Sequence, residues 1–160
     1  MNKLAEELVA LLKKHGLTVT TAESCTGGLV SAAITAIPGS SAVLDGALVS
    51  YASAVKGRFL EIEPSILYEV GVVSKECAEA MAKGAAKLFA ADAAIAVTGN
   101  AGPSAGDPSA PIGRVYIAAY LLGTVSVREL NLSGDRNAVR EAAAKEAIGL
   151  LCSRLQETFG

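Results

Sequence analysis

The 160-residue sequence has no tryptophan and only three phenylalanines and four tyrosines. Aromatic side chains that stack on unpaired bases are therefore scarce. The sequence also lacks a large excess of positive or negative charge, because 14 basic and 16 acidic residues leave a net charge of −2. No basic stripe with interleaved aromatics marks a nucleic-acid-binding surface. We therefore expect no nucleic-acid partner.

Cysteines are few, odd in number and widely spaced, at positions 25, 77 and 152, with no Cys-x-x-Cys pair. This pattern argues against a zinc site and against a disulfide framework. Cys77 and Cys152 fall on helical patterns and are expected in the core. We expect neither a metal ion nor a cofactor.

Long apolar runs are absent too. Hydrophobic residues make up 51% of the chain and the mean hydropathy is +0.42, yet no run reaches the roughly 18 residues that span a bilayer. Residues 1–7 include two acids where a signal peptide carries only positive charge. We expect a cytoplasmic protein without a membrane partner, folded as a single domain over residues 1–160, a length that is enough for one core.

Only one histidine is present. His15 follows two lysines and precedes Gly16, which is typical of a helix C-terminus. A Ser-His-Asp or Cys-His arrangement is thus nearly excluded. Any nucleophile must be activated by a lysine, a tyrosine or a carboxylate.

Apolar periodicity predicts helices alternating with strands. Such alternation, with one hairpin near the C-terminus, predicts a three-layer α/β/α sandwich with a mixed sheet. The predicted helices cover residues 3–15, 26–37, 52–60, 64–68, 74–90 and 135–159, and the strands 17–22, 46–51, 93–98, 114–122 and 125–132.

The segment from Thr20 to Gly28 reads Thr-Thr-Ala-Glu-Ser-Cys-Thr-Gly-Gly and joins a strand to a helix. Such a turn presents Ser24 and free backbone N–H groups at a positive helix end, which suits an anion or a developing oxyanion. The alternative is that Ser24 or Thr26 only caps the helix. Cys25 could itself be the nucleophile if Lys56 or the helix dipole made it a thiolate.

Strand ends that converge on one sheet edge would bring three groups together: Ser24, Tyr51 with Lys56, and Thr98 with the glycine-rich loop that follows it. A partly desolvated Lys56 can take the Ser24 proton, and Tyr51 can relay a proton or orient the lysine. The alternatives are a solvated lysine, a core tyrosine and a disordered loop over residues 98–113.

Arg136 and Arg140 lie four residues apart at the start of the last helix and share a face. Two guanidinium groups there could clamp a phosphate or a carboxylate. The alternative is a surface pair matched with Glu129 or Glu141.

Several segments together resemble the CinA C-terminal domain, the bacterial nicotinamide mononucleotide amidohydrolase family, over about residues 4–156. The segments that carry this resemblance are Thr21–Gly28, Pro38–Ser41, Tyr51–Lys56, Gly71–Ser74, Val97–Pro103, Pro111–Gly113 and Ser133–Arg136.

The resemblance implies an enzyme of NAD recycling that cleaves the carboxamide of nicotinamide mononucleotide to nicotinate mononucleotide and ammonia. It implies Ser24, Tyr51 and Lys56 as catalytic residues, and this chain as the stand-alone form. A homo-oligomer is left open. The residues expected to bind substrate are Cys25, Thr26, Gly27, Gly28, Thr98, Gly99, Arg136 and Arg140.

The chain departs from the family pattern at several positions. Ser53 stands where the family usually has asparagine, and Asn100 replaces an apolar residue. Residues 104–107 are less rich in glycine than the family loop, and Arg114 follows Pro-x-Gly where the family usually has a small residue. The first departure favours an alternative reading, a nucleotide-binding or regulatory module without hydrolysis. A further alternative is an amidohydrolase for another amide.

Overall fold

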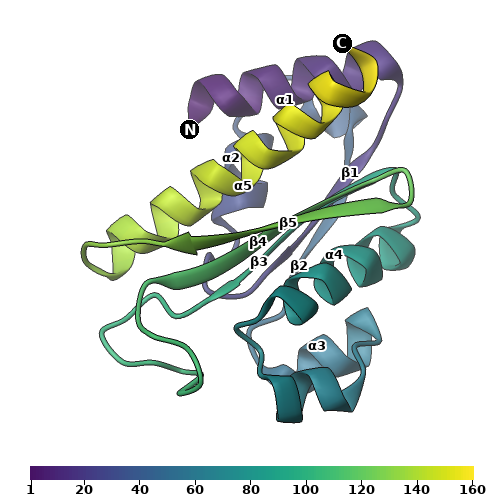
Figure 1. Cartoon of the computed structure of the whole chain (residues 1–160). Helices are drawn as coiled ribbons and strands as arrows, with labels where there is room; N and C mark the ends of the chain where they lie inside the picture. The colour runs from purple at the N-terminus through teal and green to yellow at the C-terminus, as the bar shows by residue number, and fades with distance from the viewer.

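The computed structural model describes all 160 residues and contains one five-stranded sheet with helices on both faces (Figure 1). The elements are α1 (Asn2–His15), β1 (Val19–Glu23), α2 (Leu29–Thr35), η1 (Ser40–Ala42), β2 (Leu44–Val49), α3 (Ser53–Leu60), η2 (Ile66–Val70), α4 (Lys75–Phe89), β3 (Ala93–Gly99), β4 (Arg114–Leu121), β5 (Thr124–Asn131) and α5 (Arg136–Phe159).

The strand order is β2-β1-β3-β4-β5. Strands β2, β1 and β3 are parallel, whereas β4 and β5 are antiparallel to their neighbours. Helices α1, α2 and α5 cover one face, and α3 and α4 the other (Figure 1). The predicted three-layer α/β/α sandwich with a mixed sheet is confirmed. The carboxyl ends of β1, β2 and β3 consequently meet at one edge of the sheet.

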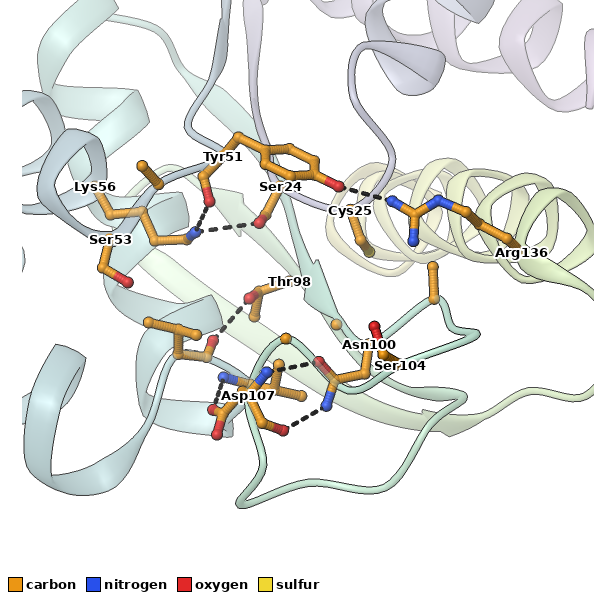
Figure 2. Close-up of a pocket in the computed structure, with 16 residues that line it drawn as sticks. Ser24, Cys25, Tyr51, Ser53, Lys56, Thr98, Asn100, Ser104, Asp107 and Arg136 are labelled. Carbon is orange, nitrogen blue, oxygen red and sulfur yellow. Dashed lines mark hydrogen bonds between the residues drawn. The ribbon is translucent and has the colours of Figure 1, made fainter.

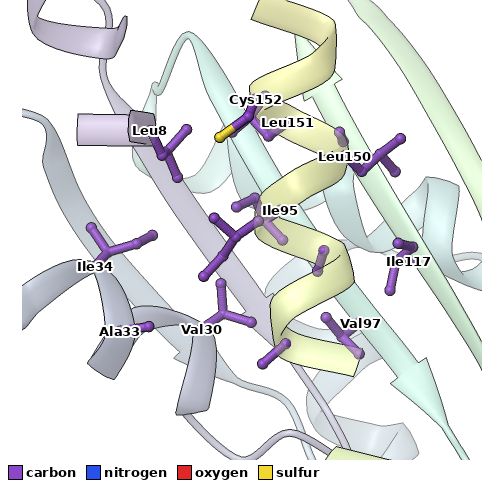
Figure 3. Packing of buried hydrophobic residues seen from close by; sticks show 14 of the residues in the cluster. Leu8, Val30, Ala33, Ile34, Ile95, Val97, Ile117, Leu150, Leu151 and Cys152 are labelled. Atoms are coloured by element: carbon purple, nitrogen blue, oxygen red, sulfur yellow. The ribbon is translucent and has the colours of Figure 1, made fainter. Parts of the chain in front are cut away.

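The alternation of side chains along β3 separates two cores. Ala93, Ile95 and Val97 belong to the larger cluster beneath α1, α2 and α5, part of which Figure 3 shows. Ala94 and Ala96 belong to a smaller cluster beneath α4. Because successive strand residues face opposite sides of a sheet, an apolar strand of this kind must be covered on both faces.

Small residues let α4 approach its neighbours closely. Its buried face consists largely of alanines. A Cβ added at Gly84 would lie 2.3 Å from the carbonyl oxygen of Leu60, the last residue of α3. Glycine at this position therefore allows α3, which carries Lys56, to pack closely against α4.

The largest difference from the predicted elements lies between β1 and α2. The helix expected from residue 26 begins at Leu29, because a turn intervenes in which the Gly27 N–H donates to the Ser24 carbonyl (3.0 Å). Gly27 and Gly28 have positive φ angles of 57° and 103°, which glycine adopts at no steric cost.

The alternative in which Ser24 or Thr26 only caps α2 is excluded, because neither side chain caps the helix. The buried carboxylate of Glu23 accepts hydrogen bonds from three N–H groups in the first turn of the helix, those of Gly28, Val30 and Ser31. Elsewhere Ser74 and Asp135 cap α4 and α5.

None of the helices combines the length and the apolar character that a membrane-spanning helix requires.

Candidate active site

A pocket of about 390 Å³ opens at the edge where β1, β2 and β3 end. Its size is that of a small-molecule site. The first residues of α3, the segment before α4, the 98–113 loop and the start of α5 surround it. Its lining consists of Ser24, Cys25, Tyr51, Ala52, Ser53, Lys56, Val72, Val73, Thr98, Gly99, Asn100, Ala101, Ser104, Gly106, Asp107 and Arg136 (Figure 2).

Lys56 is the most unusual residue of the pocket, because its side chain is only 1% exposed. Its Nζ donates to Ser24 Oγ at 3.1 Å and to the backbone carbonyl of Tyr51 at 3.2 Å (Figure 2). No carboxylate forms an ion pair with it. Burial lowers the pKa of Lys56 from its ordinary value, and Cys77 and Cys25 oppose the shift. A neutral amine beside a hydroxyl can act as a general base.

Ser24 directly follows β1 and lies at the floor of the pocket. Its own N–H donates to the Val97 carbonyl at 2.9 Å, which ties the nucleophile candidate to β3. The neighbouring Cys25 is buried, and burial raises the pKa of its thiol to about 11. Cys25 therefore remains a thiol near neutral pH, whereas a nucleophilic cysteine requires a thiolate. The geometry favours Ser24 over Cys25 as the attacking group.

Tyr51 and Lys56 meet through the tyrosine backbone and not through its ring. The Tyr51 side chain is 58% exposed and extends toward α5, where its hydroxyl accepts from Arg136 at 2.7 Å (Figure 2). Arg136 also donates to the Gly102 carbonyl at 2.6 Å. The structure thus places the Tyr51 carbonyl on Lys56 and the Tyr51 hydroxyl on Arg136.

Several predicted substrate-binding residues do not line the pocket. Thr26 is buried with an unpaired hydroxyl, Gly27 and Gly28 belong to the turn but do not line the pocket, and the Gly28 N–H donates to Glu23. Arg140 was expected beside Arg136 as a phosphate clamp, yet its guanidinium donates to the carbonyls of the 24–28 turn. Among the four predicted binding residues at positions 25–28, only Cys25 contributes to the pocket wall.

Thr98 and Gly99 do line the pocket, at the end of β3. The Thr98 hydroxyl donates to the Val72 carbonyl at 2.7 Å. It therefore holds the segment before α4, whose Val72 and Val73 form an apolar part of the wall. Neither valine was expected at the site, although the family resemblance included their segment.

The 98–113 loop is fastened from within by Asn100, which is buried. Its amide donates to the carbonyls of Asp107 and Ala110 and accepts from the Asp107 N–H. The Asp107 carboxylate in turn accepts from the N–H groups of Val73 and Ser109 and from the Ser109 hydroxyl. The loop is thus joined to the segment before α4 and is not an open loop. Asp107 is the only carboxylate in the loop. This was the one feature of the sequence from which its role in the loop could have been predicted.

We expect Asp107→Asn to destabilise the fold by about 1–3 kcal/mol at neutral pH, because buried N–H groups lose a charged acceptor. Burial raises the pKa of the Asp107 carboxyl, but hydrogen bonds from Ser109 and Val73 outweigh burial and lower it below its ordinary value. The stabilising contribution is therefore present at neutral pH and is lost as the pH falls through the lowered pKa. Thermal unfolding from pH 7 to pH 3 measures this difference.

Asp45→Asn, which alters an exposed carboxylate on β2, is the matched control and should leave the midpoint within error of wild type. An Asp107→Asn variant as stable as the Asp45 variant at pH 7 would show that the carboxylate does not hold the loop.

The sequence of this chain matches the family model of the CinA C-terminal domain over residues 1–155. The chain belongs to the CinA C-terminal domain family. It is 44% identical over 148 residues to a CinA-like protein of Dictyoglomus thermophilum, which covers 92% of this chain and 36% of that protein. A CinA-like protein of Thermotoga neapolitana is 39% identical, covering 97% of the chain and 38% of the relative. The chain thus spans little more than a third of these relatives.

Solved structures of the CinA superfamily have the same fold over nearly the whole chain. A competence-damaged protein (CinA) superfamily protein from Klebsiella pneumoniae superposes with a TM-score of 0.93 at 32% identity, covering 98% of both chains. The competence/damage inducible protein CihA from Agrobacterium tumefaciens gives 0.92 at 38% identity, covering 97% of this chain and 94% of that one. These likenesses establish the family and the fold.

Proposed function

We propose that this CinA-family domain is an amidohydrolase that converts nicotinamide mononucleotide into nicotinate mononucleotide and ammonia. The observation that supports it best is the buried Lys56 amine 3.1 Å from the Ser24 hydroxyl. Burying a lysine without a carboxylate partner opposes stability. A group kept in such surroundings is a candidate for chemistry, because perturbed pKa values cluster at functional sites.

In the first half of the reaction, Ser24 Oγ attacks the carboxamide carbon while the Lys56 amine takes the hydroxyl proton. The Lys56 ammonium then gives that proton to the leaving nitrogen, and the C–N bond breaks to release ammonia. An ester between Ser24 and the nicotinoyl group remains. The hydrogen bond to the Tyr51 carbonyl keeps the amine aimed at Ser24 throughout.

In the second half, a water molecule replaces ammonia beside Lys56. The neutral amine takes a proton from this water as it attacks the ester carbon, and the proton then passes to Ser24 Oγ as the ester breaks. The net change is one water consumed, with one carboxylate and one ammonium ion formed, because the released ammonia takes up the proton that the product acid loses. Lys56 returns to its neutral form, so no other titrating group is required.

Negative charge on the carbonyl oxygen needs backbone donors. The N–H groups of Gly27 and Gly28 are not free for this role, because they donate to the Ser24 carbonyl and to Glu23. The N–H groups of Cys25 and Thr26 have no acceptor within the chain. We assign the Cys25 N–H, which belongs to a residue of the pocket wall, as an oxyanion donor, and one such donor accounts for roughly 3–4 kcal/mol of barrier.

Arg136 suits the 5′-phosphate of the substrate. It is exposed at the first turn of α5, where the helix dipole adds positive potential, and it borders the pocket opposite Lys56 (Figure 2). Its guanidinium donates to neutral oxygens of Tyr51 and Gly102 and to no carboxylate. A phosphate would therefore be its first anionic partner.

The decisive experiment measures ammonia release from nicotinamide mononucleotide, with nicotinate mononucleotide identified by mass spectrometry. Nicotinamide riboside, which lacks the phosphate, is the matched substrate. Its kcat/KM should be lower by about 10- to 100-fold, the value of a charge-assisted contact of about 1.5–3 kcal/mol. Tight binding of the nucleotide without ammonia release would instead indicate a binding module. Equal turnover of both substrates would indicate an amidase for another amide.

A further inference from the structure

The turn that carries Ser24 is held from outside by Arg140, which lies 115 residues further along the chain. Its Nε donates to the Cys25 carbonyl at 3.0 Å, and its second terminal nitrogen donates to the Thr26 carbonyl at 3.2 Å. The remaining terminal nitrogen faces its own helix, 3.5 Å from Asn137. No carboxylate pairs with this arginine. Its donors are thus directed mainly at two consecutive peptide carbonyls.

This arrangement fits a planar guanidinium and not a lysine. Two parallel N–H groups in a rigid fork can bind neighbouring carbonyl oxygens together, whereas an ammonium is a point charge on a flexible stem. The approach is close, because a Cβ added at Gly27 would lie 3.3 Å from the Arg140 guanidinium. On the other side of the turn, Glu23 holds the N–H groups of α2. The turn is therefore fastened through both its carbonyls and its amides.

The carbonyls that Arg140 binds belong to the second and third peptide groups after Ser24. The Cys25 carbonyl shares its peptide group with the Thr26 N–H, one of the two amides with no acceptor in the chain. A cation on the carbonyl fixes the plane of that peptide and polarises its N–H. Arg140 can therefore affect the direction of Ser24 and of the adjacent Cys25 amide without touching a ligand.

We infer that Arg140 is a positioning residue that fixes the Ser24 turn for attack, and not a ligand for the phosphate. This inference rests on the proposed function for its kinetic consequences. Arg136, four residues earlier on α5, borders the pocket, whereas Arg140 does not. The two arginines therefore have separate tasks. Arg136 contributes to binding and affects KM, and Arg140 contributes to the transition state and affects kcat.

The kinetic test compares Arg140→Met, Arg140→Lys and Lys145→Met in nicotinamide mononucleotide hydrolysis. Lys145 is exposed on the same helix, so its variant removes the same charge without touching the turn. We expect Arg140→Met to lower kcat by about 10- to 100-fold, the effect of a small misplacement of reacting groups. KM should stay within about twofold, because no ground-state contact is removed. Arg140→Lys should recover part of kcat, and Lys145→Met should match wild type. An unchanged kcat, or a raised KM with normal kcat, would overturn the inference.

Hydrogen exchange of the peptide spanning residues 24–31 provides a second test that does not depend on the reaction. The Gly27 and Gly28 amides are hydrogen-bonded within the turn and should exchange faster in Arg140→Met than in Lys145→Met, at equal thermal midpoints. If wild type releases no ammonia, the proposed function fails, but this measurement still decides whether Arg140 holds the turn. Equal exchange in the two variants would overturn the positioning role. Arg140→Lys serves both assays if Arg140→Met does not fold.

Discussion

Replacing Ser24 with alanine is expected to reduce hydrolysis of nicotinamide mononucleotide by on the order of 10³-fold or more, because removing a nucleophile eliminates the covalent route. Binding should persist, since the change removes one hydroxyl and leaves Arg136 and the pocket wall in place. Ammonia release measures the first effect, and isothermal titration calorimetry with the intact nucleotide measures the second. Loss of turnover with retained affinity would establish Ser24 as part of the chemistry.

Two comparisons make this result specific. Ser65→Ala removes an exposed hydroxyl that does not line the pocket and should hydrolyse the nucleotide as wild type does. Cys25→Ala, combined with Ser24→Ala, tests the neighbouring thiol. If Ser24→Ala kept substantial activity and the double variant lost it, Cys25 would be the nucleophile despite the raised pKa of its thiol, and the proposed mechanism would be wrong.

Local chemistry was sufficient to predict most elements of the fold. The apolar run at 93–97 indicates a strand covered on both faces, and β3 has that place in the sheet. His15 and Gly16 indicated the end of α1, where Gly16 adopts the left-handed conformation. In each case the signal is a property of a few adjacent residues, such as periodicity, a cap or a positive φ.

The pairing of Ser24 with Lys56 could also be predicted, because it depends on topology. Ser24 follows β1 and Lys56 follows β2, and these strands are parallel neighbours with Glu23 opposite Val49. Both groups therefore emerge at the same edge. Hydrogen bonds between segments that are not on neighbouring strands could not be predicted in this way, because the topology does not indicate that they meet. The contact between Asp107 and Val73 joins a loop to a segment 34 residues away, and only packing of the whole chain brings them together.

The turn at residues 24–28 excludes the alternative in which Ser24 or Thr26 caps α2, and it shows why. Hydroxyl side chains before a helix are usually caps, and this preference pointed to Ser24 and Thr26. A carboxylate at the end of β1 took that role, because a buried Glu23 can accept from several N–H groups at once. Since Glu23 satisfies the helix end, the Ser24 hydroxyl is free to meet Lys56. Capping by Glu23 thus explains both why neither hydroxyl caps the helix and why Ser24 can contact Lys56.

Replacing Lys56 with methionine is expected to abolish hydrolysis and, at the same time, to stabilise the fold. Activity should fall by on the order of 10³-fold or more, because Ser24 loses its base. Stability at pH 7 should rise by about 1–2 kcal/mol, since an apolar side chain of similar volume replaces a buried amine. Ammonia release and urea unfolding measure the two effects. Lys56→Arg, which stays protonated, should also be inactive.

The pH dependence of both effects follows from the lowered pKa of Lys56. Below that pKa the amine is charged in both the folded and the unfolded state. Burial of the charged amine therefore lowers the free energy of unfolding by its full amount. The cost fades as the pH rises toward the ordinary value of 10.5. The stability advantage of Lys56→Met should therefore shrink between pH 7 and pH 10. Over the same range, wild-type kcat/KM should rise as the amine loses its proton. A wild-type kcat/KM that falls as the pH rises would contradict a lysine base, and a methionine variant less stable than wild type at pH 7 would show that Lys56 is kept for structure.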